Sequence, residues 1–173
     1  MWDALIQLIL DAGPLIYLAK LDALDAIAIA GFIAVAPPSV AAEAARPELA
    51  FRHPEIAIIE RALADGVVAV ESLDEAERKL AAALVQRHGG LHAGELDVLA
   101  LGQSRGWPVC LHERQAARIA VALGIATVHL VEILFGGTPD LNQLERRIRA
   151  FARLTNMTMS DLDALMDLIR ERR

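Results

Sequence analysis

The amino-acid sequence predicts a single α/β domain built around a parallel β-sheet. Three observations favour this fold class. Short apolar runs of strand length alternate with segments of helical period along most of the chain. The first run, residues 5–10, is almost continuously apolar, as in a strand buried on both faces of a sheet. Hydrophobic residues make up 55% of the 173 residues and aromatic residues only 4%, so we expect an aliphatic core.

Proline, glycine and polar residues mark the expected ends of the N-terminal elements. Pro14 suits the first turn of a helix that follows the first strand. Residues 27–35 are apolar and predict a second strand, with a short helical continuation before it as an open alternative. Ser39 is the expected cap of the next helix, which ends near Ala45. The remaining elements of this half are a loop over 46–54, a helix over 55–64, a strand over 67–70 and a helix over 74–87.

The second half continues the alternation and then becomes helical. The expected elements are a helix from His92, a strand over 109–111, a helix over 114–123, a strand over 125–131, and helices over 141–153 and 161–172. Ser160 and Asp163 have the spacing of a capping box in which Asp replaces Glu. We therefore expect two parts, an α/β domain over 1–137 and a C-terminal helical extension over 138–173 that packs on or beside it.

Composition argues against a membrane or secreted protein. No apolar stretch reaches the ~20 residues that a membrane span needs, and the N-terminus lacks the pattern of a secretory signal. Cys110 is the only cysteine, so no intrachain disulfide is possible. We expect a cytoplasmic protein in which Cys110 is a buried apolar residue.

The charge is unevenly distributed. The chain carries a formal net charge of −6. Residues 140–173 hold seven arginines against six acids and are therefore at +1, which leaves −7 on residues 1–139. A basic segment on an acidic body is compatible with RNA contact or with a solvated helical surface.

Several acids are expected at the carboxyl edge of the sheet. Asp11 and Glu113 each follow a predicted strand, while Glu43, Glu95 and Asp97 lie near the starts of predicted helices. Helices that follow parallel strands start at this edge, where ligands of open α/β sheets bind. Each acid alone is explained by helix capping or by the helix dipole. As a set they favour a site for Mg²⁺ or Mn²⁺, because clustered carboxylates repel one another and bind hard cations.

Four ordered motifs resemble those of PIN-domain proteins. They are Asp11-Ala-Gly-Pro-Leu-Ile-Tyr-Leu-Ala-Lys20, Pro38-Ser-Val-Ala-Ala-Glu43, Gly94-Glu95-Leu-Asp97, and His112-Glu113-Arg114-Gln-Ala-Ala-Arg118. The resemblance covers about residues 5–135 and implies a three-layer α/β/α fold. It also implies a metal-dependent ribonuclease, often the toxin of a type II toxin–antitoxin pair (VapC-like).

The resemblance assigns roles to the acids. Asp11 matches the first family acid, Glu43 the second, and Glu95, with Asp97 beside it, the third. Glu113 falls where a final aspartate is usual. The implied catalytic set is therefore Asp11, Glu43, Glu95 and Glu113, and Asp97 joins these four as a metal ligand. RNA is the implied substrate, and an antitoxin protein and a second copy of the chain are the candidate partners.

One motif departs from the family pattern. Two adjacent aspartates are usual before the arginine of the last motif, and this chain has His112 and Glu113 instead. Glutamate is one methylene longer than aspartate. Histidine at this position coordinates a softer ion such as Mn²⁺, donates to phosphate, or is an ordinary hydrogen-bonded residue at a strand end, and these alternatives stay open. Two alternatives to an active nuclease follow: a degenerate PIN module that binds RNA or a partner without cleavage, and a structural α/β module whose acids cap helices.

Overall fold

The computed structural model describes residues 5–172 and contains a parallel β-sheet of four strands within them. The strand order is β3-β2-β1-β4, and every neighbouring pair is parallel. The strands are β1 (Ile6–Leu10), β2 (Phe32–Ala36), β3 (Val68–Val70) and β4 (Val109–Cys110). The predicted fold class is confirmed, because helices cover both faces of this sheet.

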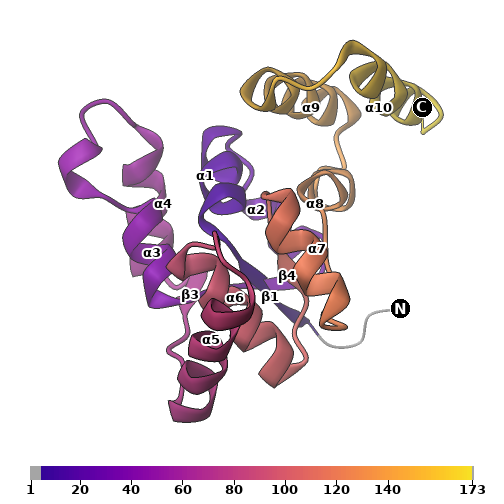
Figure 1. The fold of residues 1–173 in the computed structure, drawn as a ribbon. Helices are drawn as coiled ribbons and strands as arrows, with labels where there is room; N and C mark the ends of the chain where they lie inside the picture. Colours follow the sequence, from indigo (N-terminus) through magenta and orange to yellow (C-terminus); the bar gives the residue numbers. More distant parts are fainter. Residues whose placement is uncertain (1–4, 173) are drawn as a thin grey trace.

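The helices form the outer layers. They are α1 (Ala12–Lys20), α2 (Asp25–Ile29), α3 (Pro38–Ala44), α4 (Glu55–Ala64), α5 (Glu75–Arg87), α6 (Ala93–Arg105), α7 (Arg114–Ala122), α8 (Leu130–Gly137), α9 (Leu141–Thr155) and α10 (Met159–Arg170), with a 3₁₀ turn, η1 (Pro47–Leu49). Helices α5 and α6 lie on one side of the sheet and α1 and α2 on the other (Figure 1). No helix within residues 5–172 is long and apolar enough to cross a membrane.

The inner strand β1 is buried on both faces, as its apolar sequence predicts. Leu8, Ile9 and Leu10 are fully buried. The chain leaves β1 toward β2 on one side, and β4 adds on the other side only after two further crossovers. The strand order therefore reverses between β1 and β4. Ligands of open α/β sheets bind at the carboxyl ends of such a strand pair.

Two strand predictions need correction. Residues 125–131 do not form a strand: Thr127 makes one isolated bridge to Val109, and α8 begins at Leu130. The two residues of β4 offer too short an edge for a longer ladder. Residues 27–35 divide into the end of α2 and the start of β2, because Gly31 turns the chain with φ +92.

Two predicted caps are also wrong. Pro37, not Ser39, is the N-cap of α3, and the Ser39 hydroxyl bonds elsewhere. Thr158 caps α10 and accepts a hydrogen bond from the Asp161 N–H at 3.1 Å, so the cap lies two residues before the predicted Ser160. Threonine and serine are similar caps, and local sequence alone did not discriminate between them.

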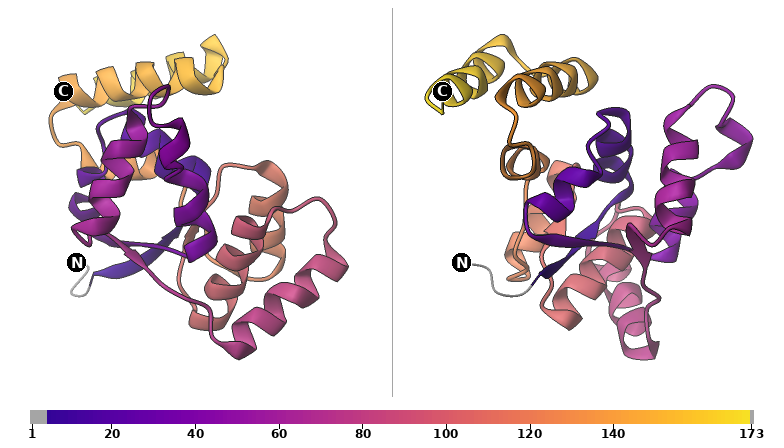
Figure 2. Two further views of the ribbon diagram at one scale, coloured as in Figure 1. Left: turned by 90° about the vertical axis from the view of Figure 1, so that its left-hand side faces the viewer. Right: turned by 180° about the vertical axis from the view of Figure 1, so that it is seen from behind.

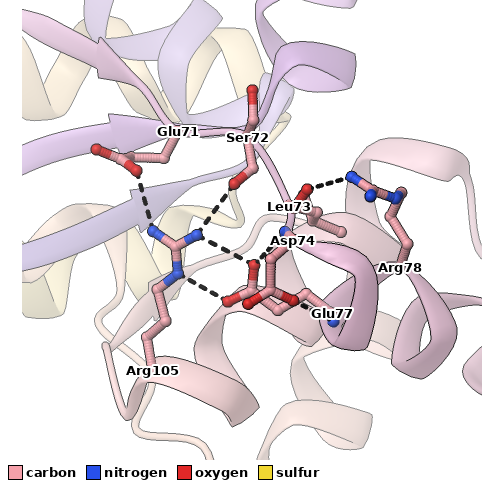
Figure 3. A network of polar contacts seen from close by, with 7 residues as sticks. All are labelled: Glu71, Ser72, Leu73, Asp74, Glu77, Arg78 and Arg105. Atoms are coloured by element: carbon pink, nitrogen blue, oxygen red, sulfur yellow. Dashed lines mark hydrogen bonds and ion pairs between the residues drawn. The ribbon is translucent and has the colours of Figure 1, made fainter.

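Arg105, the last residue of α6, joins this helix to the segment between β3 and α5 (Figure 3). Its Nε donates to Glu77 Oε1 at 2.8 Å and its Nη1 to Glu71 Oε2 at 3.0 Å. Glu77 is buried, and the hydrogen bond from Arg105 is the main cause that lowers the Glu77 pKa to about 2. The opposite end of α6 starts at the carboxyl edge, so this network fixes the helix that carries Glu95.

Helix α9 is fixed against the start of α2 by a buried arginine. Arg147 is only 5% exposed. It donates to Thr138 Oγ1 and to Asp25 Oδ1, each at 2.9 Å, and to the carbonyl oxygen of Asp22. Figure 2 shows α9 and α10 together beyond α1, on the side of the sheet away from α5 and α6. The division into an α/β domain over 1–137 and an extension over 138–173 stays a prediction.

Candidate active site

Four of the five predicted acids line one cavity of about 270 Å³. They come from four places in the chain: the end of β1, helix α3, the first turn of α6, and the start of α7. The four are Asp11, Glu43, Glu95 and Glu113, and we call this cavity the carboxylate pocket. It lies where the sheet order reverses, as the sequence predicts for acids that follow parallel strands.

Asp11 and Glu95 are the two buried carboxylates of these four, with 6% and 5% exposure, whereas Glu43 and Glu113 are exposed. The Asp11 backbone N–H donates to the Cys110 carbonyl at 3.1 Å, which holds the end of β1 against β4. Asp11 occupies the N-cap position of α1, but its side chain makes no cap hydrogen bond. The structure therefore does not support helix capping as the role of the Asp11 side chain, whose carboxylate lines the pocket.

The pocket raises the pKa of the Asp11 carboxyl group. Burial raises its pKa to about 6, and the negative charges of Glu95, Glu43 and Glu113 act in the same direction. The backbone N–H of Ala12 acts against them. The pocket thus holds carboxylates close enough to destabilise one another, as expected of a site that a cation neutralises.

Glu43 and Glu95 approach Asp11 across the N-terminal turn of α6. Glu95 Oε2 accepts a hydrogen bond from the His92 N–H at 2.7 Å, which fixes its side chain beside the helix start. Glu43 is exposed and lies in the last turn of the seven-residue helix α3, later than predicted. A Cβ at Gly94 would lie 3.1 Å from Val40 Cγ2 of α3, but only in ordinary contact with Glu43 Oε2 at 3.5 Å and Asp11 Oδ1 at 3.7 Å. Glycine at this position therefore allows α6 to pack closely against α3, which carries Glu43.

Glu113 and His112 form the opposite wall. Glu113 is the N-cap residue of α7, and its side chain makes no cap hydrogen bond either. The His112 ring packs edge-on against Tyr17 of α1, with ring centroids 4.8 Å apart. A Cβ at Gly13 would lie 3.1 Å from His112 Cβ, so glycine allows the two segments to approach. The departure from the family pattern is accommodated without displacing Glu113 from the pocket.

Asp97 is not brought into the pocket lining. Its Oδ2 accepts a hydrogen bond from the Ser39 hydroxyl at 2.6 Å, which joins α6 to the start of α3. Asp97 follows Glu95 by two residues, and residues two apart on a helix do not share a face. Glu95 therefore lines the pocket, whereas Asp97 joins α6 to α3.

A family model described as a PIN domain matches residues 7–156. This chain belongs to the PIN-domain family. PIN domains are generally nucleases, so the family supports a hydrolase. No curated protein and no solved structure gives a significant match to the chain.

The donor set of this PIN domain fits a hard divalent cation, although the side chains do not form a closed site. Within residues 5–172, no three His, Cys, Asp or Glu side chains form a group ready to hold a metal ion. Mg²⁺ commonly binds through one or two carboxylates and keeps several waters, so a closed cage is not required. The carboxylate oxygens, the open cavity and the raised Asp11 pKa all fit such binding.

Several residues that line or shape the carboxylate pocket were not predicted as site residues. Ala12, Gly13, Ile16 and His92 line it, and Gly94 allows the close packing of α6 and α3 beside it. A signal existed for Gly94, because a glycine inside a helix lowers stability and often marks a close approach. Nothing in the local sequence distinguished Ile16 from other apolar residues of its helix.

Proposed function

We propose that this chain is a metal-dependent endoribonuclease that cleaves RNA phosphodiester bonds at the carboxylate pocket. The observation that supports this activity most strongly is the convergence of Asp11, Glu43, Glu95 and Glu113 on one cavity at the reversal of strand order. The PIN-domain family supports nuclease chemistry in general. The choice of RNA, of Mg²⁺ or Mn²⁺, and of these residues as catalytic is our inference.

The four carboxylates of the pocket would hold Mg²⁺ or Mn²⁺. Such an ion supplies an activated water and positive charge opposite the scissile phosphate. Asp11 is the central ligand in this proposal, because its backbone is fixed between β1 and β4 and the three glutamates surround it. Asp97 acts as a positioning residue, since its hydrogen bond to Ser39 orients α3, which carries Glu43, relative to α6, which carries Glu95.

Other parts of the pocket suit a phosphate group. Helices α1, α6 and α7 begin at Asp11, His92 and Glu113, so three helix N-termini meet at the cavity. Unpaired N–H groups and the positive end of the helix dipole favour an anion there once the carboxylates are neutralised. His112, which is exposed in the pocket wall, is placed to donate to a phosphate oxygen.

The biological context of this activity rests on the motif resemblance alone. We infer that the chain is the toxin of a type II toxin–antitoxin pair, acts in the cytoplasm, and binds an antitoxin protein and a second copy of itself. A small protein encoded by the neighbouring gene should then co-purify with it and inhibit cleavage. If that protein neither binds nor inhibits, the nuclease proposal stands without the toxin role.

The nuclease proposal is tested by cleavage of a pool of structured RNAs with purified protein and Mg²⁺ or Mn²⁺. Asp11→Asn should abolish cleavage. Glu113→Gln keeps the side-chain shape and removes the charge, so we expect a loss of at least about tenfold, or ~1.4 kcal/mol of barrier. Asp163→Asn on the exposed face of α10 removes one carboxylate outside the pocket and should leave the rate unchanged.

The same assay tests the alternative, a PIN module that binds without cutting. The open carboxylate arrangement and the His112-Glu113 pair favour that alternative. It is correct if wild type and Asp11→Asn are equally inert with both metals. If wild type cuts and Glu113→Gln cuts equally well, the nuclease stands and Glu113 is not part of its site.

A further inference from the structure

A second, basic groove lies between the end of α1 and the face of α9, with a volume of about 610 Å³. It is separate from the carboxylate pocket and larger. Its lining contains one lysine and four arginines, and Asp22 is the one acid in it. The basic residues are Lys20, Arg146, Arg147, Arg149 and Arg153. The opposite charge of the two hollows suggests that they contact different parts of one ligand.

The cations of the basic groove are not equivalent. Arg147 is buried and engaged with Thr138 and Asp25, so it fixes α9 and is not available to a ligand. Arg146 and Arg153 are exposed, and within residues 5–172 neither makes a hydrogen bond or an ion pair.

Two further cations of the groove have acidic partners. Arg149 pairs with Glu145 at 3.0 Å and both side chains are partly exposed, whereas Lys20 pairs at 3.4 Å with Glu55, which is buried. Exposed ion pairs are weak, so Arg149 remains available to phosphate, while Glu55 holds Lys20 at the edge of the groove. Spacings of three and four residues place Arg146, Arg149 and Arg153 on one face of α9.

A third hollow, of about 210 Å³, neighbours both the basic groove and the carboxylate pocket. Ile16 and Glu43 line both this hollow and the carboxylate pocket. Lys20 lines both this hollow and the basic groove. The three hollows therefore follow one another along α1, and we call this succession the track. From Asp11 to Lys20 the helix rises about 13 Å, at 1.5 Å per residue.

The two ends of this track are held in a fixed relation by Tyr17. Its ring packs edge-on against His112 at the carboxylate pocket and against Phe151 of α9, with centroid distances of 4.8 Å and 5.8 Å. Arg147, which lies on α9 like Phe151, anchors α9 to Asp25 at the start of α2. A ligand bound in the basic groove is thus presented at a defined position relative to Asp11.

We propose that a single RNA strand extends from the carboxylate pocket along α1 and that its phosphates bind in the basic groove. The groove contacts are Arg146, Arg149 and Arg153. A positively charged groove that follows a backbone is how proteins bind single strands without sequence readout. This proposal rests on the proposed nuclease function, because it places the cleaved bond at the carboxylates.

The test compares two labelled RNAs: a dinucleotide, which is too short to span the ~13 Å from Asp11 to the basic groove, and a single strand of about 12 nucleotides, within the range of known single-strand sites. Binding is measured by fluorescence anisotropy at several salt concentrations with Mg²⁺, in the Asp11→Asn background to prevent cleavage. The triple variant Arg146→Gln/Arg149→Gln/Arg153→Gln should reduce the salt slope for the long RNA by about 2, at about 0.7 per phosphate. Its affinity for the long RNA should fall at least about tenfold at low salt, while the short RNA is bound as before.

A matched variant controls for the loss of three positive charges. Arg61, Lys79 and Arg170 are exposed and line none of the three hollows, so Gln at these positions removes the same charge elsewhere. The single variant Arg146→Gln provides a check that does not depend on α9 folding, because this side chain has no hydrogen-bond or ion-pair partner among residues 5–172. It should lower the slope by about 0.7.

The outcomes separate this proposal from the nuclease function. If the matched variant weakens binding as much as the groove variant, if both RNAs are affected alike, or if neither binds, the groove proposal is wrong. In parallel, cleavage of the same long RNA is measured with wild-type protein and with the groove variant, both of which retain Asp11. If the protein does not cleave but its RNA binding depends on the groove arginines, the nuclease proposal is wrong and the groove proposal stands. If the groove variant cleaves as fast as wild type, the groove proposal is wrong and the nuclease proposal stands.

Discussion

Replacement of Asp11 by asparagine should stabilise the metal-free protein, and the gain should depend on pH. Burial and the three neighbouring glutamates raise the Asp11 pKa from 3.8 to about 6. Between these two values the folded state binds more protons than the unfolded state, so the stability contributed by this group falls as pH rises. The difference between the two pKa values corresponds to about 3 kcal/mol of unfolding free energy. The folded protein has lost all of this stabilisation once the pH is above about 6.

Asparagine carries no charge at any of these pH values, so Asp11→Asn removes the penalty. Without metal, the variant should exceed wild type by about 3 kcal/mol at pH 8 and by well under 1 kcal/mol at pH 4. Any constant effect of the amide group cancels in the comparison of the two pH values. A gain of this size shifts the thermal midpoint by roughly 6–12 °C in a protein of this length.

The measurement is urea unfolding at pH 4 and pH 8 with a chelator, followed by the same series with Mn²⁺. Metal should stabilise wild type more than Asp11→Asn, because the ion binds the folded carboxylates. Asp163→Asn controls for the change in net charge and should show the same difference from wild type at both pH values. If Asp11→Asn differs from wild type equally at pH 4 and pH 8, the electrostatic account of the pocket is wrong.

Two further predictions concern stability away from the pocket. The hydrogen bond from Arg105 lowers the Glu77 pKa from 4.5 to about 2, so this pair stabilises the fold above pH 4.5 and loses that contribution as pH falls toward 2. Glu77→Gln should therefore lower the free energy of unfolding by about 2–3 kcal/mol at pH 7 and by less than half of that at pH 3, as measured by urea unfolding. An equal loss at both pH values would contradict the link between this pKa and stability. Gly137 lies so close to α2 that a Cβ would approach the Ala26 carbonyl oxygen to 2.0 Å. Gly137→Ala should lower stability by more than about 2 kcal/mol in thermal unfolding, whereas Gly89→Ala, where a Cβ meets no atom within 4 Å, should change it little.

The sequence by itself determined the fold class and four residues of the candidate site. These follow from local patterns: a doubly buried strand is nearly all apolar, and a carboxylate directly after it must lie at the carboxyl edge. Asp11 and Glu113 were predictable for this reason, and the end of the helix over 55–64 was predictable from Asp65 and Gly66, which follow it. Glu43 was expected at the same edge, but near the start of its helix, whereas it lies in the last turn of α3.

Tertiary structure alone decided which elements meet. Asp97 lies two residues from Glu95, yet it contacts Ser39 across α3 instead of lining the pocket. Residues 125–131 have strand composition, but they pair with β4 only through the single bridge from Thr127 to Val109. Arg147 resembles its neighbours in the basic segment in sequence, and only the packing of α9 near the start of α2 makes it a buried anchor. Its contact with Asp25 joins residues 122 apart in the chain. The geometry of such contacts depends on how helices pack on a common sheet, which no local pattern in the sequence encodes.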